Sequence, residues 1–128
     1  NGYEAEMVKH TRALRRKKKP SYVLFLNRPT VRSSQLAQEL AKELSKRTGA
    51  PTLRIRHHPA EKTKTSAVDI AQDLAGARAV VGQESAAMAI AVAVGIPTIS
   101  IVERGVSKLL PHKSIVQVRS AKAAARLI

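Results

Sequence analysis

Two adjacent histidines, His57 and His58, stand where an alternating strand pattern meets a proline in the segment LRIRHHP (53–59). Adjacent side chains of an extended chain point to opposite faces, so these imidazoles are a poor pair of ligands for one metal ion. Because the chain also lacks cysteine and any HExxH or CxxC motif, we expect no metal site. Two interpretations stay open. Either a histidine hydrogen-bonds a neighbouring loop, or one imidazole, with His58 favoured, donates a hydrogen bond to a phosphate or nucleotide.

A second candidate is an anion site in the segment GQESAAM (82–88). Gly82 allows a sharp turn after a predicted strand, and Glu84 or Ser85 caps the helix that follows. The free backbone N–H groups of a helix N-terminus bind phosphate and other anions, and the Ser85 hydroxyl accompanies them. The alternative is that Ser85 serves only as an N-cap, which is a frequent role of serine.

A third candidate is the segment NRPTVRSS (27–34), in which Arg28 and Arg32 stand beside hydroxyl groups. These arginines clamp a phosphate in one interpretation and are solvated in the other, and the segment is neither a P-loop nor a GxGxxG loop. Glu103, which follows another predicted strand, either contacts a ribose or sugar hydroxyl or is solvated. No nucleophile, base and acid form a catalytic pattern, since Ser85 lacks a GxSxG context.

The elements that must position these residues alternate regularly between strand and helix. Leu36, Leu40 and Leu44 recur at helical spacing, with a serine cap before them and Gly49 after them. The predicted strands are 22–27, 52–56, 78–82, 97–102 and 114–118, and the predicted helices are 3–19, 33–49, 66–77, 85–95 and 120–128. This alternation predicts an α/β fold, a three-layer Rossmann-like domain over 21–128 with a parallel sheet of about five strands. In such a sheet, ligands bind outside the carboxyl ends of the strands.

Residues 1–20 are interpreted as a basic helix or linker that precedes this domain. Met7, Leu14 and Tyr3 can form one apolar stripe, and Pro20 stops the helix. The run RRKKK is either a solvated helix end or a polybasic arm.

The composition limits the class of protein. A chain of 128 residues suits one domain of ordinary size, and 44% hydrophobic residues exclude a disordered tail. With only 2% aromatic residues the core must be aliphatic, which is typical of α/β folds. The lack of cysteine fits a cytoplasmic setting, no apolar run reaches the roughly 18 residues of a membrane span, and there is no signal peptide. Because the chain begins at Asn1 rather than Met, we expect a fragment or a processed product.

The net charge of +14 indicates an anionic partner such as nucleic acid, acidic lipid or a phosphorylated ligand. Among the few carboxylates, Asp69 and Asp73 stand four residues apart on a predicted helix. That spacing is typical of a solvated helix face, so we expect no chemistry from them.

The order of these motifs resembles the C-terminal, nucleotide-binding half of GT-B glycosyltransferases, which contain two Rossmann-like domains. A strand ending in HP, a strand ending in a serine-bearing turn and the stretch AVAVGIPTIS (91–100) are similar to the pattern of bacterial sialyltransferases and capsule-type transferases that use CMP-linked sugars. The resemblance covers roughly residues 21–118. The segment ESAA departs from the pattern, with Glu84 where a second serine often stands, so a UDP-linked or other donor stays open.

The resemblance implies that His58 and Ser85 hold the donor phosphate, helped by the amides of Ser85 and Ala86. Hydrogen-bond donors placed on a leaving phosphate lower the barrier to glycosyl transfer. The resemblance also implies that the acceptor pocket and catalytic base belong mainly to a missing N-terminal domain or partner subunit, to which the helix 3–19 connects. It implies no cofactor beyond the nucleotide sugar, and a cytoplasmic location, with the basic helix available for peripheral contact with a membrane.

Two other functions compete with this one. A basic α/β module that binds nucleic acid fits the net charge, but 2% aromatic residues leave no platform on which bases of a single strand can stack. A polyanionic acceptor, such as nucleic acid or an acidic polysaccharide, unites the two ideas. A structural domain whose charge serves assembly is the third possibility.

Overall fold

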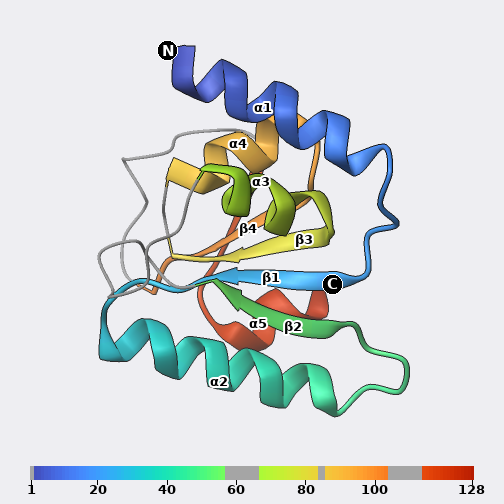
Figure 1. Ribbon diagram of the computed structural model, residues 1–128. Helices are drawn as coiled ribbons and strands as arrows, with labels where there is room; N and C mark the ends of the chain where they lie inside the picture. The colour runs from blue at the N-terminus through green and yellow to red at the C-terminus, as the bar shows by residue number, and fades with distance from the viewer. Residues whose placement is uncertain (1, 57–66, 84–85, 104–113) are drawn as a thin grey trace.

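The computed structural model describes residues 2–56, 67–83, 86–103 and 114–128, and within them a five-stranded, all-parallel sheet lies between two layers of helices (Figure 1). The strands are β1 (Tyr22–Leu26), β2 (Thr52–Arg56), β3 (Ala77–Gly82), β4 (Thr98–Ile101) and β5 (Ile115–Val118). Their spatial order is β2-β1-β3-β4-β5. The α/β, Rossmann-like fold expected from the alternating pattern is therefore confirmed.

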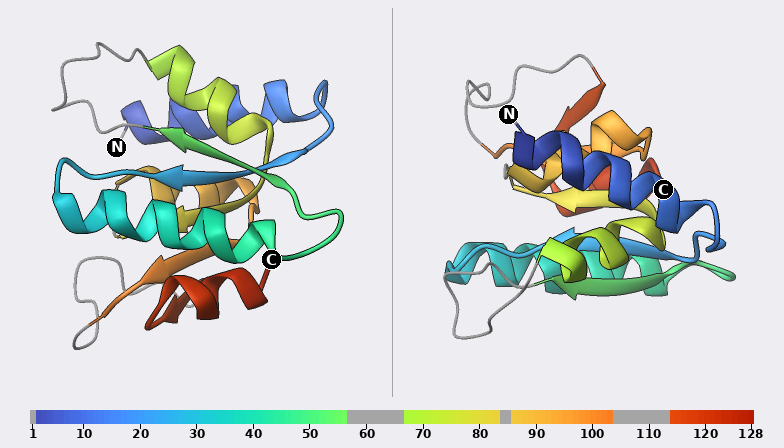
Figure 2. Two further views of the ribbon diagram at one scale, coloured as in Figure 1. Left: turned by 90° about the horizontal axis from the view of Figure 1, so that it is seen from below. Right: turned by 45° about the horizontal axis from the view of Figure 1, so that its top comes forward.

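The helices divide between the two faces of the sheet (Figure 2). Helices α2 (Val31–Ser45) and α5 (Ala121–Arg126) cover one face, and α1 (Gly2–Arg15), α3 (Ala67–Ala75) and α4 (Ala86–Val94) lie over the other. Leu36, Leu40 and Leu44 of α2 are buried, as their helical spacing predicted. The strands between these layers are rich in aliphatic residues, because a parallel strand is covered on both faces.

Helix α2 begins earlier than its serines suggested. The N-cap is Thr30, whose Oγ1 accepts a hydrogen bond from the Ser33 backbone N–H at 3.1 Å. Ser33 is fully buried within the first turn, and its Oγ accepts from the Arg28 N–H at 2.9 Å. At the other end the C-cap is Lys46, and Gly49, with φ of +74°, lies in the turn beyond. The predicted serine cap was wrong because an earlier hydroxyl already satisfies the first-turn amides.

Helix α1 packs against α3 and α4. Met7 is buried in the same hydrophobic cluster as residues of the sheet, and Leu14 packs against that cluster. Arg12 Nη2 donates to the carbonyl oxygen of Ala93 in the last turn of α4 at 2.7 Å. Arg15 Nη1 donates to the carbonyl oxygens of Ala75, at the end of α3, and of Ala77. Two cationic side chains of α1 thus satisfy carbonyl groups where α3 and α4 end.

The strand order reverses beside β1, because β2 and β3 lie on opposite sides of it. In open parallel sheets the connections diverge to the two faces at such a reversal and leave a crevice outside the carboxyl ends of the strands. Gly82, the last residue of β3, is needed for the close approach of β3 to β1, because a Cβ there would lie 2.9 Å from the Leu26 carbonyl oxygen. The reversal at β1 and β3 is therefore where the fold itself favours a ligand site.

Candidate functional site

Four of the residues singled out in the sequence are described, and all four lie at the carboxyl end of the sheet. Arg28 follows β1, Arg32 is in the first turn of α2, Ala86 begins α4, and Glu103 comes two residues after β4. Parallel pairing of every strand places these positions at one end. The remaining candidates, His57, His58, Glu84 and Ser85, lie outside the described residues.

Arg32 and Glu103, which are 71 residues apart in sequence, form a two-point ion pair across this end of the sheet. Arg32 Nε donates to Glu103 Oε1 at 2.8 Å, and Nη2 donates to Oε2 at 2.5 Å. Nη1 of Arg32 also lies 3.2 Å from Glu39 Oε1. The hydrogen bonds to Glu103 raise the pKa of the Arg32 guanidinium above its ordinary value. The sequence suggested a phosphate contact and a sugar contact at these positions, and the structure shows that the two side chains contact each other.

This ion pair remains open to exchange with a ligand. The side chain of Arg32 is 42% exposed and that of Glu103 is 33% exposed. Exposed ion pairs contribute little to stability, because water screens them and two side chains lose freedom in forming them. An incoming phosphate can therefore compete with Glu103 for the guanidinium, and a sugar hydroxyl can compete with Arg32 for the carboxylate. Arg28 is exposed nearby, anchored through its backbone N–H to Ser33 Oγ.

Three buried side-chain atoms at this end of the sheet have no hydrogen-bond partner: Nη2 of Arg56, the last residue of β2, Oδ1 of Asn27 and Oγ of Ser100. Asn27, just after β1, is 6% exposed; its Nδ2 makes a long 3.5 Å hydrogen bond to Ser34 Oγ, and its Oδ1 makes none. Ser100, in β4, is 1% exposed, and its Oγ has no partner. An unpaired buried polar atom costs about 1–3 kcal/mol, so such atoms are rare in native proteins and call for a specific reason. They occur here on both sides of the end of β3, where the strand order reverses.

Ser100 lies within the predicted strand 97–102 and was not among the candidate site residues. Ile99 and Ile101 pack in the cluster on the α2 and α5 face, so the side chain of Ser100 points to the α4 face. In register, Ser100 pairs with Gly82 on the neighbouring strand β3. A hydroxyl between two buried isoleucines was the available signal, because it breaks the continuous apolar run of a buried parallel strand.

A second cluster of charges holds the end of β2, the strand that His57 directly follows. Asp73 of α3 pairs with Arg54 Nη2 at 2.8 Å and with Arg56 Nη1 at 2.7 Å. The Asp73 side chain is only 13% exposed, so the expectation of a solvated helix face was wrong for this residue. The pattern alone could not show it, because both partners come from a neighbouring strand. Tyr22 donates its hydroxyl hydrogen to the Asp73 carbonyl oxygen at 2.6 Å, and burial raises the pKa of this phenol.

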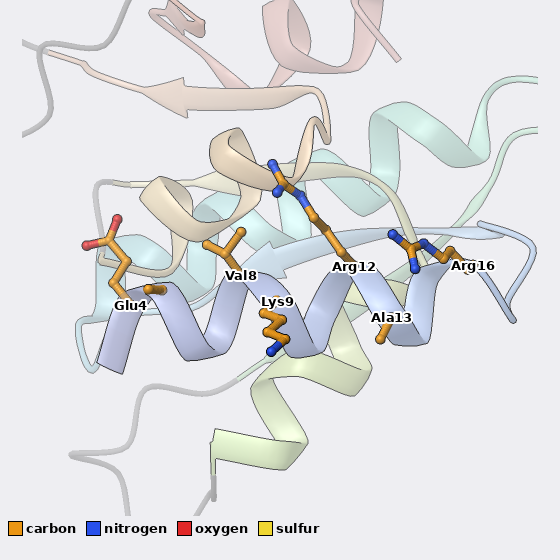
Figure 3. A pocket seen from close by; sticks show the side chains of 7 residues that line it. Glu4, Val8, Lys9, Arg12, Ala13 and Arg16 are labelled. Carbon is orange, nitrogen blue, oxygen red and sulfur yellow. The ribbon is translucent and has the colours of Figure 1, made fainter. Parts of the chain in front are cut away.

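A hollow of about 680 Å³ runs along α1, where its side chains are spread along one face of the helix (Figure 3). Its described lining consists of Glu4, Ala5, Val8, Lys9, Arg12, Ala13 and Arg16. These residues all belong to α1, except Arg16, which directly follows it, and they include no strand end. The hollow is therefore an open surface groove and separate from the site at the carboxyl end of the sheet.

Within the described ranges, no group of three histidine, aspartate or glutamate side chains is placed to bind a metal ion. No helix in those ranges has the length and apolar character needed to cross a membrane. Comparisons of the chain with protein-family models, with curated proteins and with solved structures find no match.

Proposed function

We propose that this chain is the nucleotide-sugar binding domain of a glycosyltransferase and that it holds the donor phosphate at the carboxyl end of the sheet. The observation that carries the proposal is the unpartnered Oγ of Ser100, buried beside Gly82 on the face covered by α4. Because phosphate oxygens are strong hydrogen-bond acceptors, a buried hydroxyl on the face that α4 covers is suited to one of them.

The α4 face supplies the other groups that a phosphate needs. Helix α4 begins at Ala86, and its first-turn amides carry the positive end of the helix dipole. On this proposal Ser85 and His58 add a hydroxyl and an imidazole to the same phosphate, as the resemblance to the transferases implies.

The ion pair between Arg32 and Glu103 suits the sugar part of the donor. When a donor binds, Arg32 exchanges Glu103 for a phosphate oxygen, and Glu103 accepts a hydrogen bond from a ribose or sugar hydroxyl. Both side chains stay hydrogen-bonded in either state, which keeps the cost of the exchange low. Arg28 adds a positive charge at the mouth of the site and draws the anionic donor toward it.

Transfer itself needs groups from a second domain or partner subunit that carries the acceptor and the catalytic base. In that assembly this chain stabilises the charge that develops on the leaving nucleotide phosphate. The donor is CMP-linked or UDP-linked, and the acceptor is itself polyanionic, in keeping with the net charge of +14. The same charge favours contact with acidic surfaces.

Titration of the isotope-labelled chain with CMP and with UDP, followed by NMR, tests the proposal. We expect the largest shifts at Ser100, Ala86 and the segment 27–33, and affinity about tenfold lower in Ser100→Ala, which loses one hydrogen bond to a charged group. Ser45→Ala, which removes an exposed hydroxyl at the end of α2, is the matched control and leaves the affinity unchanged. NMR shifts confined to surface lysines and arginines would exclude a donor-phosphate site at Ser100. Equal losses of nucleotide affinity in Ser100→Ala and Ser45→Ala would also exclude it.

A nucleic-acid-binding module is the second candidate, favoured by the exposed cations of the described chain. Its signature is an affinity for duplex DNA or RNA that falls steeply with salt and does not change in Ser100→Ala. The same two variants therefore separate the two functions.

A further inference from the structure

The amino end of the sheet, opposite the proposed ligand site, carries a surface of nearly uniform positive charge. We call it the basic end, and it consists of Arg16, Lys17, Lys18, Lys19, Lys42, Lys46, Arg47, Lys122 and Arg126. Every one of these side chains is exposed. The carboxylate that lies among them is Glu43, which pairs with Lys46 at 3.1 Å. The basic end therefore presents a strong positive potential to anything that approaches it.

Topology brings these residues together from distant parts of the chain. Residues 16–19 lead into β1, and Lys42, Lys46 and Arg47 lie at the end of α2, just before β2. Arg47 joins α5 to this group, because its Nη1 and Nη2 donate to the carbonyl oxygens of Ala125 and Ile128, each at 2.7 Å. Figures 1 and 2 show the end of α1 and the turn after α2 projecting from the same end of the molecule.

The charges flank both faces of the sheet instead of lining one deep pocket. The end of α1 belongs to one helical layer, and α2 and α5 belong to the other. The hollow between α2 and α5 is open and lined by Glu43, Lys46, Arg47, Lys122, Ala125 and Arg126. A broad distribution of flexible cations matches a broad anionic surface better than a single small ligand.

From these features we propose that the basic end docks on an anionic lipid bilayer. Leu127, with 56% of its surface exposed beside Arg126, is an apolar side chain that can enter the headgroup region. The described part of the basic end carries no aromatic ring on which a base could stack, and the ring of Tyr22 in neighbouring β1 is already covered by Arg54 at 5.5 Å. These two features favour lipid over nucleic acid. Docked in this way, the chain directs the carboxyl end of its sheet away from the membrane.

Flotation with vesicles tests the proposal with variants that each remove two positive charges. The full chain is mixed with vesicles of phosphatidylcholine alone and of phosphatidylcholine with phosphatidylglycerol, at low and at physiological ionic strength. We expect binding only to the vesicles that contain phosphatidylglycerol, and weaker binding as salt is raised. The double variants K18Q/K19Q and K42Q/K122Q should each lower the partition coefficient about thirtyfold. The first variant alters the connection from α1 to β1 and the second alters the layer formed by α2 and α5, so both must respond if the whole basic end docks.

The matched control is K9Q/R28Q, which removes two charges from exposed residues outside the basic end and should lower the partition coefficient less than threefold. An equal loss in the control would show that net charge, rather than this surface, drives binding, and would overturn the proposal. So would tighter binding of duplex DNA or RNA than of the anionic vesicles at the same ionic strength. Thermal unfolding of each variant checks that the fold is kept after the exposed positive charges are removed. Both basic-end variants should bind CMP and UDP with unchanged affinity. A failure of the membrane-docking proposal can therefore be distinguished from a failure of the donor-site proposal.

Discussion

The two ends of the parallel sheet use the same residue type, arginine, in opposite ways. At the carboxyl end Arg32 is held by the carboxylates of Glu103 and Glu39, which a ligand can replace. Toward the amino end Arg15 and Arg47 donate to backbone carbonyl oxygens where helices finish. A carbonyl at a helix end has no other partner within its helix, so these arginines are structural. The ion pair of Arg32 at the carboxyl end is partly exposed, whereas much of the charge at the amino end is either structural or faces solvent.

The largest effect is expected where a charged pair is buried between the two ends. Asp73→Asn keeps the shape of the side chain but leaves Arg56, whose side chain is 8% exposed, without a countercharge. We expect the free energy of unfolding, measured with urea, to fall by about 3 kcal/mol. Glu43→Gln, which breaks an exposed pair with Lys46, is the control and should change it by less than about 0.5 kcal/mol. Equal effects of the two variants would mean that burial does not distinguish these ion pairs.

Next in size is a direct comparison of Arg15 with Arg32. Arg15→Met removes two hydrogen bonds from a charged, part-buried donor and should cost about 2 kcal/mol of stability while leaving nucleotide affinity unchanged. Arg32→Met should change stability by less than about 1 kcal/mol, since its ion pairs are exposed, and should weaken nucleotide binding. Urea unfolding and nucleotide titration of both variants measure the two quantities. If Arg15→Met instead weakens nucleotide binding and Arg32→Met lowers stability by about 2 kcal/mol, the two arginines do not differ in the way described here.

A smaller effect is expected from the residue that competes with a ligand for Arg32. Glu103→Gln keeps the size of the side chain and removes its charge, so Arg32 becomes more available to phosphate. Affinity for inorganic phosphate, measured by the shift of the Arg32 side-chain NMR signal, should rise about threefold. Affinity for a complete nucleotide sugar should rise less, because the variant weakens the contact that we propose between Glu103 and a sugar hydroxyl. A loss of phosphate affinity would show that Glu103 does not compete for this guanidinium.

The smallest effect concerns pH at the amino end, where Tyr22 begins β1. Burial raises the pKa of its phenol, so the folded chain holds this proton more tightly than the unfolded chain. The resulting stability is complete below the ordinary phenol pKa of about 10 and is lost as pH rises through the folded value. Urea unfolding between about pH 9 and pH 11 should therefore show a decrease in stability that Tyr22→Phe reduces. A decrease of the same size in both proteins would exclude Tyr22 as its source.

Much of the fold was predictable from local patterns in the sequence. The spacing of Leu36, Leu40 and Leu44 predicted α2, and the predicted strand 52–56 coincides with β2. Helix α1 ends at Arg15, four residues before the predicted end, because the chain turns at Arg16 and Lys17 ahead of Pro20. Because parallel strands present their carboxyl ends together, the pattern also placed Arg28, Arg32 and Glu103 at one end of the sheet.

Partners and directions of individual side chains required the three-dimensional arrangement. Arg32 meets Glu103 only because the strand order β2-β1-β3-β4-β5 brings the start of α2 near the end of β4. Asp73 is buried against two arginines because α3 lies over β2, and Ser100 faces α4 because of the register of β4. Periodicity along a chain reports which residues are covered, and this information is local. Which charge meets which depends on distances between elements far apart in sequence, and those distances exist only once the sheet has assembled.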